Sequence, residues 1–352
     1  MCYIQNEKNI LQYWQKSCTF AKNIDSMLSR HFMRSKVLQS LYAYAVSDSD
    51  DLGVIEKNFL YNIERLNDLE ITQLSTLIYF FEFAQKSIEE GKNKFMPSQE
   101  EANPNMKFVE NRFATELINN YELKKHCDRL KINWTNYADI FRGLYTSFKA
   151  SKAYKNYMAN EVDDFDAQKK VILDLFKHIM NYESLVDVFI ERNLFWEDDF
   201  YQIAQHSYNI LKKFDSAFDA ASSLPLVYNA KDAVEADAFN FASTLLKKTI
   251  LSFNESTDII KQNLKQWEYD RVAVMDIIII KLAITELINF PTIPEKVTIN
   301  ECIELSKEYS TDKSKLFING ILDKIHNELR SKGKVRKVGR GLVDGDLLEE
   351  EE

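Results

Sequence analysis

The stretch Asp276–Asn289, DIIIIKLAITELIN, decides the fold class of this 352-residue chain. Its apolar residues occur nearly all round a helical projection, which is typical of a helix buried between other helices. The run Ile277–Ile280 alone would suit a strand, but apolar residues continue on both sides beyond the length of a core strand. The stretch therefore predicts a central helix, which Pro291 and Pro294 end.

Two more helices are expected after these prolines. Thr298-Ile-Asn-Glu301 has the pattern of a capping box, so we expect the next helix to start there. Thr311 and Asp312 offer an N-cap for a last helix, which should run to about Ser331 with Gly333 beyond its end.

Composition favours a helical fold along the whole chain. Eight glycines and five prolines are too few for the tight turns of many-stranded sandwiches or of α/β enzymes with glycine-rich loops. The apolar content of 45%, with 23 phenylalanines and 17 tyrosines, is enough for a sizeable core. We predict an all-α protein, a helical bundle with an additional, duplicated helical region.

Helical periodicity also extends through the upstream part of the chain. Apolar residues at three- and four-residue spacing predict a helix over 29–46, followed by a turn at 47–53. Gly91 is expected to end the third helix, and 92–107, with two prolines, to form a surface loop. The other expected helices cover about 54–66, a stretch up to 90, 108–128, 134–159, 165–192, 197–221, 233–265 and 268–289.

The chain contains a candidate internal repeat. A shift of 71 residues superposes Asp166–Leu211 on Asp237–Leu282 and places Trp196 on Trp267. The shared pattern is a helix, a Trp-Glu-x-Asp motif and another helix. Helices of similar length can share such a pattern by chance, but we favour duplication of a helical unit.

Charge and cysteine usage restrict the class of protein. The net charge of −9 repels nucleic acid at long range, so any RNA contact needs a local basic patch. Four scattered cysteines without a C-x-x-C pair are typical of reduced thiols in a cytoplasmic protein. No apolar stretch suits a signal peptide or a membrane span. Because the sequence also lacks a metal-binding histidine motif, a nucleophile elbow, a P-loop and a dinucleotide fingerprint, we expect no catalytic, cofactor or metal site.

The last third of the chain contains four motifs in a fixed order. They are Glu286-Leu287, Pro294-Glu-Lys-Val-Thr-Ile-Asn-Glu301, Glu304-Leu-Ser-Lys307 and Phe317-Ile-Asn-Gly-Ile-Leu-Asp-Lys324. Their order and spacing resemble the C-terminal signature of the NusB family.

A second match lies near the amino end. Arg30-His-Phe-Met-Arg34 followed by Val37-Leu-Gln-Ser-Leu-Tyr42 resembles the arginine-rich first helix of the same family. More than 200 residues separate Tyr42 from Trp267, where the C-terminal match begins. Duplicated helical material would fill this gap, as in long NusB-like proteins of the Bacteroidetes type.

The resemblance implies a helical, non-catalytic transcription antitermination factor in the cytoplasm. NusB proteins bind the boxA element of ribosomal RNA leader transcripts together with the small-subunit ribosomal protein NusE, and the pair joins RNA polymerase. We therefore expect boxA-like RNA, NusE and the transcription elongation complex with other Nus factors as partners, and no membrane. The alternative is a NusB-fold scaffold that binds a protein partner without specific RNA recognition. An RNA cytosine methyltransferase with a NusB-like domain is not expected, because no methyl-donor site follows the signature.

Carried over position by position, the family's RNA surface falls on seven residues of this chain. Basic groups would hold phosphates, and aromatic rings would stack on unpaired bases. The structural alternatives are solvated charges for the basic residues and a core or rim position for the aromatic ones. The seven residues are Arg30, His31, Arg34, Tyr42, Lys313, Lys315 and Phe317.

This surface departs from the family pattern in its charge. His31 and Phe32 replace two of the usual consecutive arginines, and Leu316 stands where a basic residue precedes the phenylalanine. Together with the net charge of −9, this predicts weak RNA binding by the chain alone, with a shallow salt dependence, and rescue by a basic ribosomal-protein partner. Asn319-Gly320 suggests close approach of another helix, because a helical glycine costs about 1 kcal/mol relative to alanine.

We expect four segments along the chain. Residues 1–27 would be an N-terminal extension, with Met27 as an alternative natural start. Residues 28–230 would hold the first helix with its RNA-binding motif and the extra helical region, and 231–331 the NusB-like C-terminal domain. Residues 332–352 would be a disordered tail, basic over Lys332–Arg340 and acidic at its end, either simply solvated or an auxiliary contact to RNA phosphates.

Overall fold

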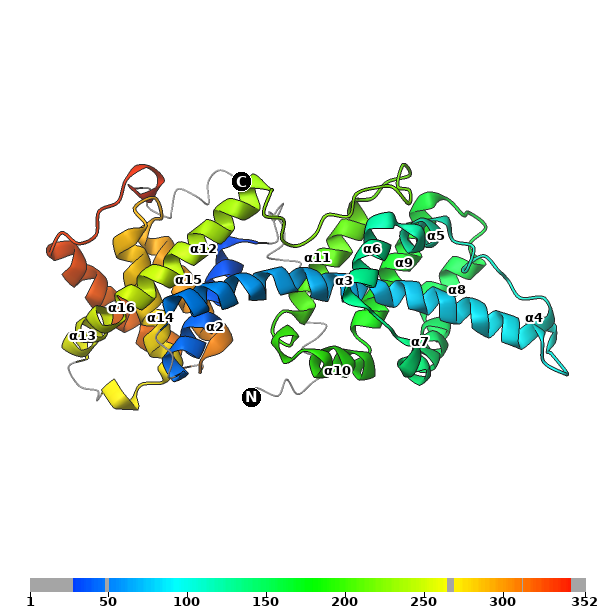
Figure 1. Cartoon of the computed structure of the whole chain (residues 1–352), viewed down its shortest axis with the longest axis horizontal. Coiled ribbons are helices and arrows are strands. Elements are labelled where there is room, and N and C mark those ends of the chain that lie inside the picture. The colour runs from blue at the N-terminus through cyan, green and yellow to red at the C-terminus, as the bar shows by residue number, and fades with distance from the viewer. Residues whose placement is uncertain (1–27, 48–50, 265–268, 312, 343–352) are drawn as a thin grey trace. The chain divides into compact units, whose positions relative to one another are not determined.

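The computed structural model describes residues 28–47, 51–264, 269–311 and 313–342 (Figure 1). Over these residues the chain forms helices joined by turns and has no strand, which confirms the all-α fold class. None of the described helices combines the length and the apolar character needed to cross a membrane. The expectations for residues 1–27, Trp267, Asp312 and the acidic end fall outside the described residues.

The chain divides into two compact units. We call Ile63–Tyr228 the insert unit, and the described residues within Ser26–Asn62 and Asn229–Glu352 the terminal unit. α3 (Leu52–Lys92) begins in the terminal unit and ends in the insert unit. The division differs from the expected one, because the first helix belongs with the C-terminal helices and not with the extra helical region.

The terminal unit is organised around one buried helix, α14 (Val274–Asn289). Every residue of α14 from Asp276 to Leu287 is buried, as the apolar pattern predicted. α14 packs against all the other long helices of its unit apart from α3. These are α2 (Arg30–Val46), α12 (Ala233–Leu251), α13 (Phe253–Asn263), α15 (Glu295–Tyr309) and α16 (Ser314–Ser331).

The predicted ends of these helices are partly right. The Ser29 hydroxyl accepts the Phe32 N–H at 3.2 Å and caps α2 where the periodicity placed its start. Gly333, at φ +65°, follows α16 as expected, and the Lys334 N–H returns to the Leu329 carbonyl at 2.9 Å. The capping-box prediction for Thr298–Glu301 is wrong, because α15 already begins at Glu295 and the Thr298 and Glu301 side chains face other helices.

The insert unit has a hub helix of its own, α9 (Phe165–Met180). It packs against α5, α7, α8, α10 and α11. The bounds are α5 (Arg112–Asn119), α6 (Tyr121–Leu130), α7 (Ala138–Ala150), α8 (Lys152–Ala159), α10 (Glu183–Arg192) and α11 (Phe200–Lys213), with a short α4 (Gln99–Ala102) in the predicted surface loop.

Several helices predicted as long are pairs of shorter ones. Asn120 divides α5 from α6 and Ser151 divides α7 from α8; each side chain accepts a backbone N–H of the helix that follows. Short polar side chains compete with the helical hydrogen bonds in this way. The reverse error occurs at Gly91, which lies inside α3: the two helices predicted over 54–90 are one continuous helix.

The candidate repeat has the same order of elements in both copies. α9, α10, η3 (Leu194–Trp196) and α11 follow one another in the insert unit. α12, α13, η4 (Tyr269–Arg271) and α14 follow in the terminal unit. The agreement favours a duplicated helical unit, which stays a prediction.

Gly320 does not serve the close helix approach that its sequence suggested. It lies on an exposed part of α16, and a Cβ added there would meet no atom within 4 Å. The prediction from Asn319-Gly320 is therefore wrong, and packing does not explain this glycine.

Gly320→Ala should stabilise the protein by about 1 kcal/mol, because it removes the conformational freedom of glycine from a helix without a steric clash. Urea unfolding at neutral pH measures this difference. Gly143→Ala in α7 is the control, since its Cβ would lie 2.4 Å from the Tyr182 hydroxyl and should give no such gain. A loss of stability in Gly320→Ala would contradict the assignment of open space at this position.

Candidate functional site

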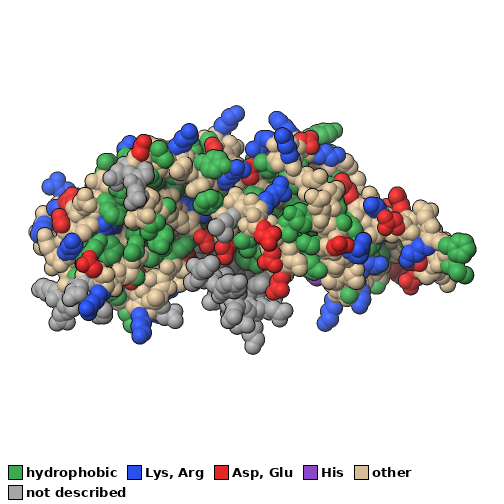
Figure 2. Space-filling model, turned by 60° about the horizontal axis from the view of Figure 1, so that its bottom comes forward, with side chains coloured by type: hydrophobic (Ala, Val, Ile, Leu, Met, Phe, Trp, Pro, Cys, Tyr) green, Lys and Arg blue, Asp and Glu red, His purple; other side chains and the backbone are tan. Residues whose placement is uncertain are grey.

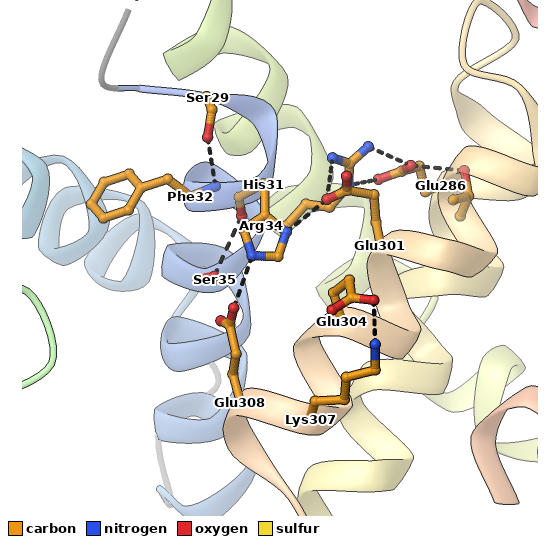
Figure 3. A network of polar contacts seen from close by, with 11 residues as sticks. Ser29, His31, Phe32, Arg34, Ser35, Glu286, Glu301, Glu304, Lys307 and Glu308 are labelled. Carbon is orange, nitrogen blue, oxygen red and sulfur yellow. Dashed lines mark hydrogen bonds and ion pairs between the residues drawn. The ribbon is translucent and has the colours of Figure 1, made fainter. Parts of the chain in front are cut away.

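The first helix of the terminal unit is fixed by a buried ion pair (Figure 3). Arg34 of α2 donates from Nε to Glu286 Oε2 at 2.7 Å and from Nη2 to Glu286 Oε1 at 2.8 Å. Its Nη1 donates to Glu301 Oε2 of α15 at 3.2 Å. The Arg34 side chain is 2% exposed and that of Glu286 is not exposed at all. One guanidinium thus joins α2 to α14 and α15.

Arg34 and Glu301 of this network stay charged. Burial alone would lower the pKa of Arg34, but the hydrogen bonds and the charge of Glu286 outweigh burial and raise it. Burial alone would raise the pKa of Glu301, but the His31 hydrogen bond and the Arg34 charge lower it. Thr298 Oγ1 donates to Glu286 Oε1 at 2.7 Å, so Glu286 accepts three hydrogen bonds in all.

His31 lies beside this network and behaves as a cation. Its Nδ1 lies 2.8 Å from Glu301 Oε2 and its Nε2 lies 3.2 Å from Glu308 Oε1. The hydrogen bond to Glu301, followed by the one to Glu308, raises the pKa of His31 to about 10. The histidine that replaces an arginine of the family pattern therefore keeps a positive charge at neutral pH, but both its nitrogens face carboxylates.

Arg30 is the exposed basic residue at the start of α2. Its guanidinium lies 3.5 Å from Asp237 Oδ2 of α12, an ion pair between two exposed side chains, which contributes little. It also lies 5.2 Å from the centroid of the Phe241 ring, and Arg34 lies 5.1 Å from the same centroid. The charge of Arg30 therefore remains accessible to a ligand.

The other candidate residues lie at the far end of α2 and at the start of α16. Tyr42 is 41% exposed, Lys313 and Lys315 are exposed, and Phe317 is half-buried. Contacts link the two places. Gln39 donates to the Tyr309 hydroxyl at 3.3 Å, and Ser310 donates to the Ser314 hydroxyl at 2.9 Å, so the end of α2 lies next to the α15–α16 turn.

The structure gives Arg34 a different role from the expected one. A guanidinium this deeply buried and held by two carboxylates offers no surface to a phosphate, so Arg34 positions helices. Sequence reasoning missed Glu286, Thr298 and Glu301 as its partners. A signal was present, because all three lie within the quoted C-terminal motifs, but nothing in the sequence connected them with a residue more than 250 positions earlier.

No cluster of metal ligands accompanies this network in the part of the chain that the structure describes. Among the described residues, no three His, Cys, Asp or Glu side chains gather as metal ligands. Burial raises the pKa of the Cys302 thiol well above its usual range, which makes it unreactive.

On the face shown in Figure 2, Lys and Arg side chains are interspersed with Asp and Glu. The fold and the site thus define an all-helical class of protein in which α2 is fixed by a buried ion pair.

Comparison with known proteins identifies the family. The model of the NusB family matches residues 200–327. A protein of Salinibacter ruber named transcription antitermination protein NusB is 38% identical over 111 residues, which cover 32% of this chain and 69% of that protein. The chain belongs to the NusB family.

Two further proteins of the same name are similar. The one from Chloroherpeton thalassium is 42% identical over 107 residues, 30% of this chain and 51% of that protein. The one from Natranaerobius thermophilus is 33% identical over 115 residues, 33% of this chain and 83% of that protein. No solved structure matches the chain. Each of these three matches spans about a third of the chain.

Arg34→Met should lower the free energy of unfolding by about 3–5 kcal/mol, because it leaves Glu286 buried without its cation. Urea unfolding measures the loss, and Arg34→Met combined with Glu286→Leu should recover much of it. Arg30→Met, four residues earlier on the same helix but exposed, should change stability by less than about 0.5 kcal/mol. Equal effects of Arg30→Met and Arg34→Met would show that the ion pair does not hold the helix.

His31 should make stability depend on pH. Because its pKa is raised from 6.5 to about 10, its contribution is complete below pH 6.5 and is lost as pH rises through 10. His31→Gln should therefore cost about 1 kcal/mol near pH 6, after allowance for solvent screening of a side chain one-third exposed, and almost nothing above pH 10. Unfolding curves of both proteins across this range measure the difference, and a constant difference would contradict the assigned ion pairs.

Proposed function

We propose that this chain acts in transcription antitermination by binding a boxA-like single-stranded RNA together with a small-subunit ribosomal protein of the NusE type, within the RNA polymerase elongation complex. One observation supports this most directly. The two family motifs, at Arg30–Tyr42 and Glu286–Lys324, lie in one compact unit, in which Arg34 joins both. This arrangement supports a single binding face formed by both motifs, despite the insert unit between them in sequence.

The proposed RNA-binding face runs along α2 and onto the start of α16. Arg30 begins it, Tyr42 lies at its far end, and Lys313, Lys315 and Phe317 continue it beyond the α15–α16 turn. Exposed cations suit phosphates, and partly exposed aromatic rings suit the unstacked bases of single-stranded RNA. Arg34 is not part of this face, and His31 contributes only through its charge.

The distribution of charge favours RNA binding more than the net charge of −9 suggested. Residues 26–62 and 229–340 together contain 22 lysines and arginines and 20 aspartates and glutamates. The acidic excess lies elsewhere: residues 63–228 contain 20 basic and 26 acidic residues, and 341–352 contain six acidic residues and no basic one. The terminal unit therefore does not repel RNA through its own charge up to residue 340.

A helical scaffold that binds a protein partner without specific RNA recognition is the second candidate. It is favoured by the ion pairs of two basic candidate residues at the start of α2. Arg34 and His31 bind carboxylates of α14 and α15. This leaves few free cations for phosphates, and a partner's basic surface would have to supply the rest.

Tyr42→Ala and Phe317→Ala should each weaken binding of a boxA-like RNA roughly fivefold or more, because each removes a stacking surface for a base. Fluorescence anisotropy measures the affinity with and without the NusE-type ribosomal protein, which should tighten wild-type binding. Tyr61→Ala is the control, since Tyr61 is another exposed tyrosine of the terminal unit but lies outside the proposed face. Unchanged RNA affinity in both variants would support the scaffold, and no gain from the ribosomal protein would overturn the joint mechanism.

A further inference from the structure

The segment that follows α16 folds back onto its own unit. The Val338 N–H donates to the Pro291 carbonyl at 2.9 Å, and Lys337 Nζ donates to the Phe290 carbonyl at 3.1 Å. Both acceptors lie in the turn between α14 and α15. We call Lys332–Leu342 the return segment. Its placement differs from the disordered tail that composition suggested.

Two glycines determine the backbone of the return segment. Gly339 has φ +55°, a conformation that other residues rarely adopt. A Cβ added to Gly341 would lie 2.0 Å from the Pro291 carbonyl oxygen, so only glycine fits against this turn. Arg340 lies between them, in the short helical turn η5 (Gly339–Leu342). The backbone on both sides of Arg340 is therefore held in a defined place.

The five basic residues of this segment are not equivalent. Lys332 pairs with Glu328, Lys334 pairs with Glu255 at 3.0 Å, and Lys337 is bound to the Phe290 carbonyl. Arg336 and Arg340 are exposed, and no described residue forms an ion pair or hydrogen bond with either side chain. Two guanidinium groups are thus presented to solvent on a docked backbone. A guanidinium group is well suited to bind phosphate through two hydrogen bonds.

The return segment is connected to the start of α2. The Phe290 ring packs edge-on against the Phe241 ring, with centroids 5.2 Å apart. Arg30 lies over that same Phe241 ring. A short series of contacts therefore links the return segment to the basic end of the proposed RNA-binding face.

We propose that Arg336 and Arg340 form a second RNA-contacting arm, which binds the phosphate backbone of the single strand where it leaves the proposed face beside Arg30. This inference rests on the proposed function. The arm provides charge and a fixed position but no group for recognising a base, so its contribution is independent of RNA sequence. It adds phosphate contacts at the end of α2 where Arg34 and His31 are engaged with carboxylates.

Arg336→Gln combined with Arg340→Gln tests this arm in the full-length chain. The probes are a boxA-like RNA of about 12 nucleotides, the same RNA extended to about twice that length, and a scrambled RNA of the longer length. We expect the double variant to lower affinity for both longer RNAs by a similar factor, on the order of tenfold at ~0.1 M salt. The slope of log affinity against log salt should fall by about 1.4, which corresponds to two single-strand phosphate contacts. The short RNA should be affected much less.

Two further variants separate the proposal from a general charge effect. Lys332→Gln combined with Lys334→Gln removes the same charge from the same segment, but both ammonium groups are already paired with carboxylates. The slope of log affinity against log salt should therefore change by less than half as much as in the arginine double variant. Gly341→Ala keeps every charge but displaces the segment from Pro291, and should lower affinity for the longer RNAs as the arginine variant does. Far-UV circular dichroism and thermal unfolding check that each variant is folded.

The outcomes distinguish this inference from the proposed function. If the wild-type chain binds none of the RNAs, with or without the NusE-type ribosomal protein, the proposed function itself fails. If the wild type binds but Arg336→Gln/Arg340→Gln keeps its affinity and salt slope, only the arm is overturned. Equal effects of the lysine and arginine double variants would show that only the net charge of the segment matters, which overturns the arm. Wild-type RNA affinity in Gly341→Ala would show that docking of the return segment on Pro291 does not contribute to RNA binding. If Arg336→Gln/Arg340→Gln keeps its RNA affinity but no longer binds an acidic peptide that the wild type binds, the two arginines contact a protein partner and the arm is overturned.

Discussion

The terminal unit depends on the buried contact of Arg34 with Glu286 and Glu301. It joins helices α2, α14 and α15, and the two carboxylates lie more than 250 residues from Arg34 in sequence. Withdrawing such charges from water costs several kcal/mol per ion, and the hydrogen bonds offset this only when donors and acceptors match closely. The contact therefore adds specificity more than net stability. The Nε and Nη2 donors of Arg34 both reach Glu286 only when α2 lies at one position along α14. This position also fixes where Arg30 and Tyr42 lie on the surface.

Sequence predicted the parts of the fold that follow from local patterns. The all-round apolar stretch of α14, the apolar spacing of α2 and the glycine after α16 depend on residues close together in the chain. The errors occur where a distant partner changes the use of a side chain. Thr298 and Glu301 have capping-box spacing, but both are engaged by the network around Glu286 and Arg34, and the helix starts earlier. The prediction that Gly91 ends a helix is wrong for the opposite reason. No distant partner is involved, and α3 continues through this glycine to Lys92.

The candidate site was predictable in residue types but not in their exposure. Arg30 and Arg34 are one helical turn apart and lie over the same Phe241 ring, yet one is exposed and the other is almost completely buried. The difference comes from Glu286 on α14, whose position relative to α2 no local pattern encodes. The return segment shows the same limit. Its composition is that of a solvated tail, and its docking depends on the distant turn at Phe290 and Pro291, whose carbonyls accept hydrogen bonds from Lys337 and Val338.

Each unit contains its own buried carboxylate paired with a basic side chain, which explains how a long insert can coexist with the site. In the insert unit, Glu70 is fully buried and lies 2.8 Å from His206 Nδ1, and it accepts the Val227 N–H at 2.9 Å. In the terminal unit the corresponding groups are Glu286 and Arg34, and no residue of 63–228 takes part in that network. Loop-closure entropy grows only as the logarithm of loop length, so 166 further residues between Asn62 and Asn229 cost α2 little in finding α14. The geometry of the proposed RNA-binding face is therefore set within the terminal unit and does not depend on the length of the insert unit.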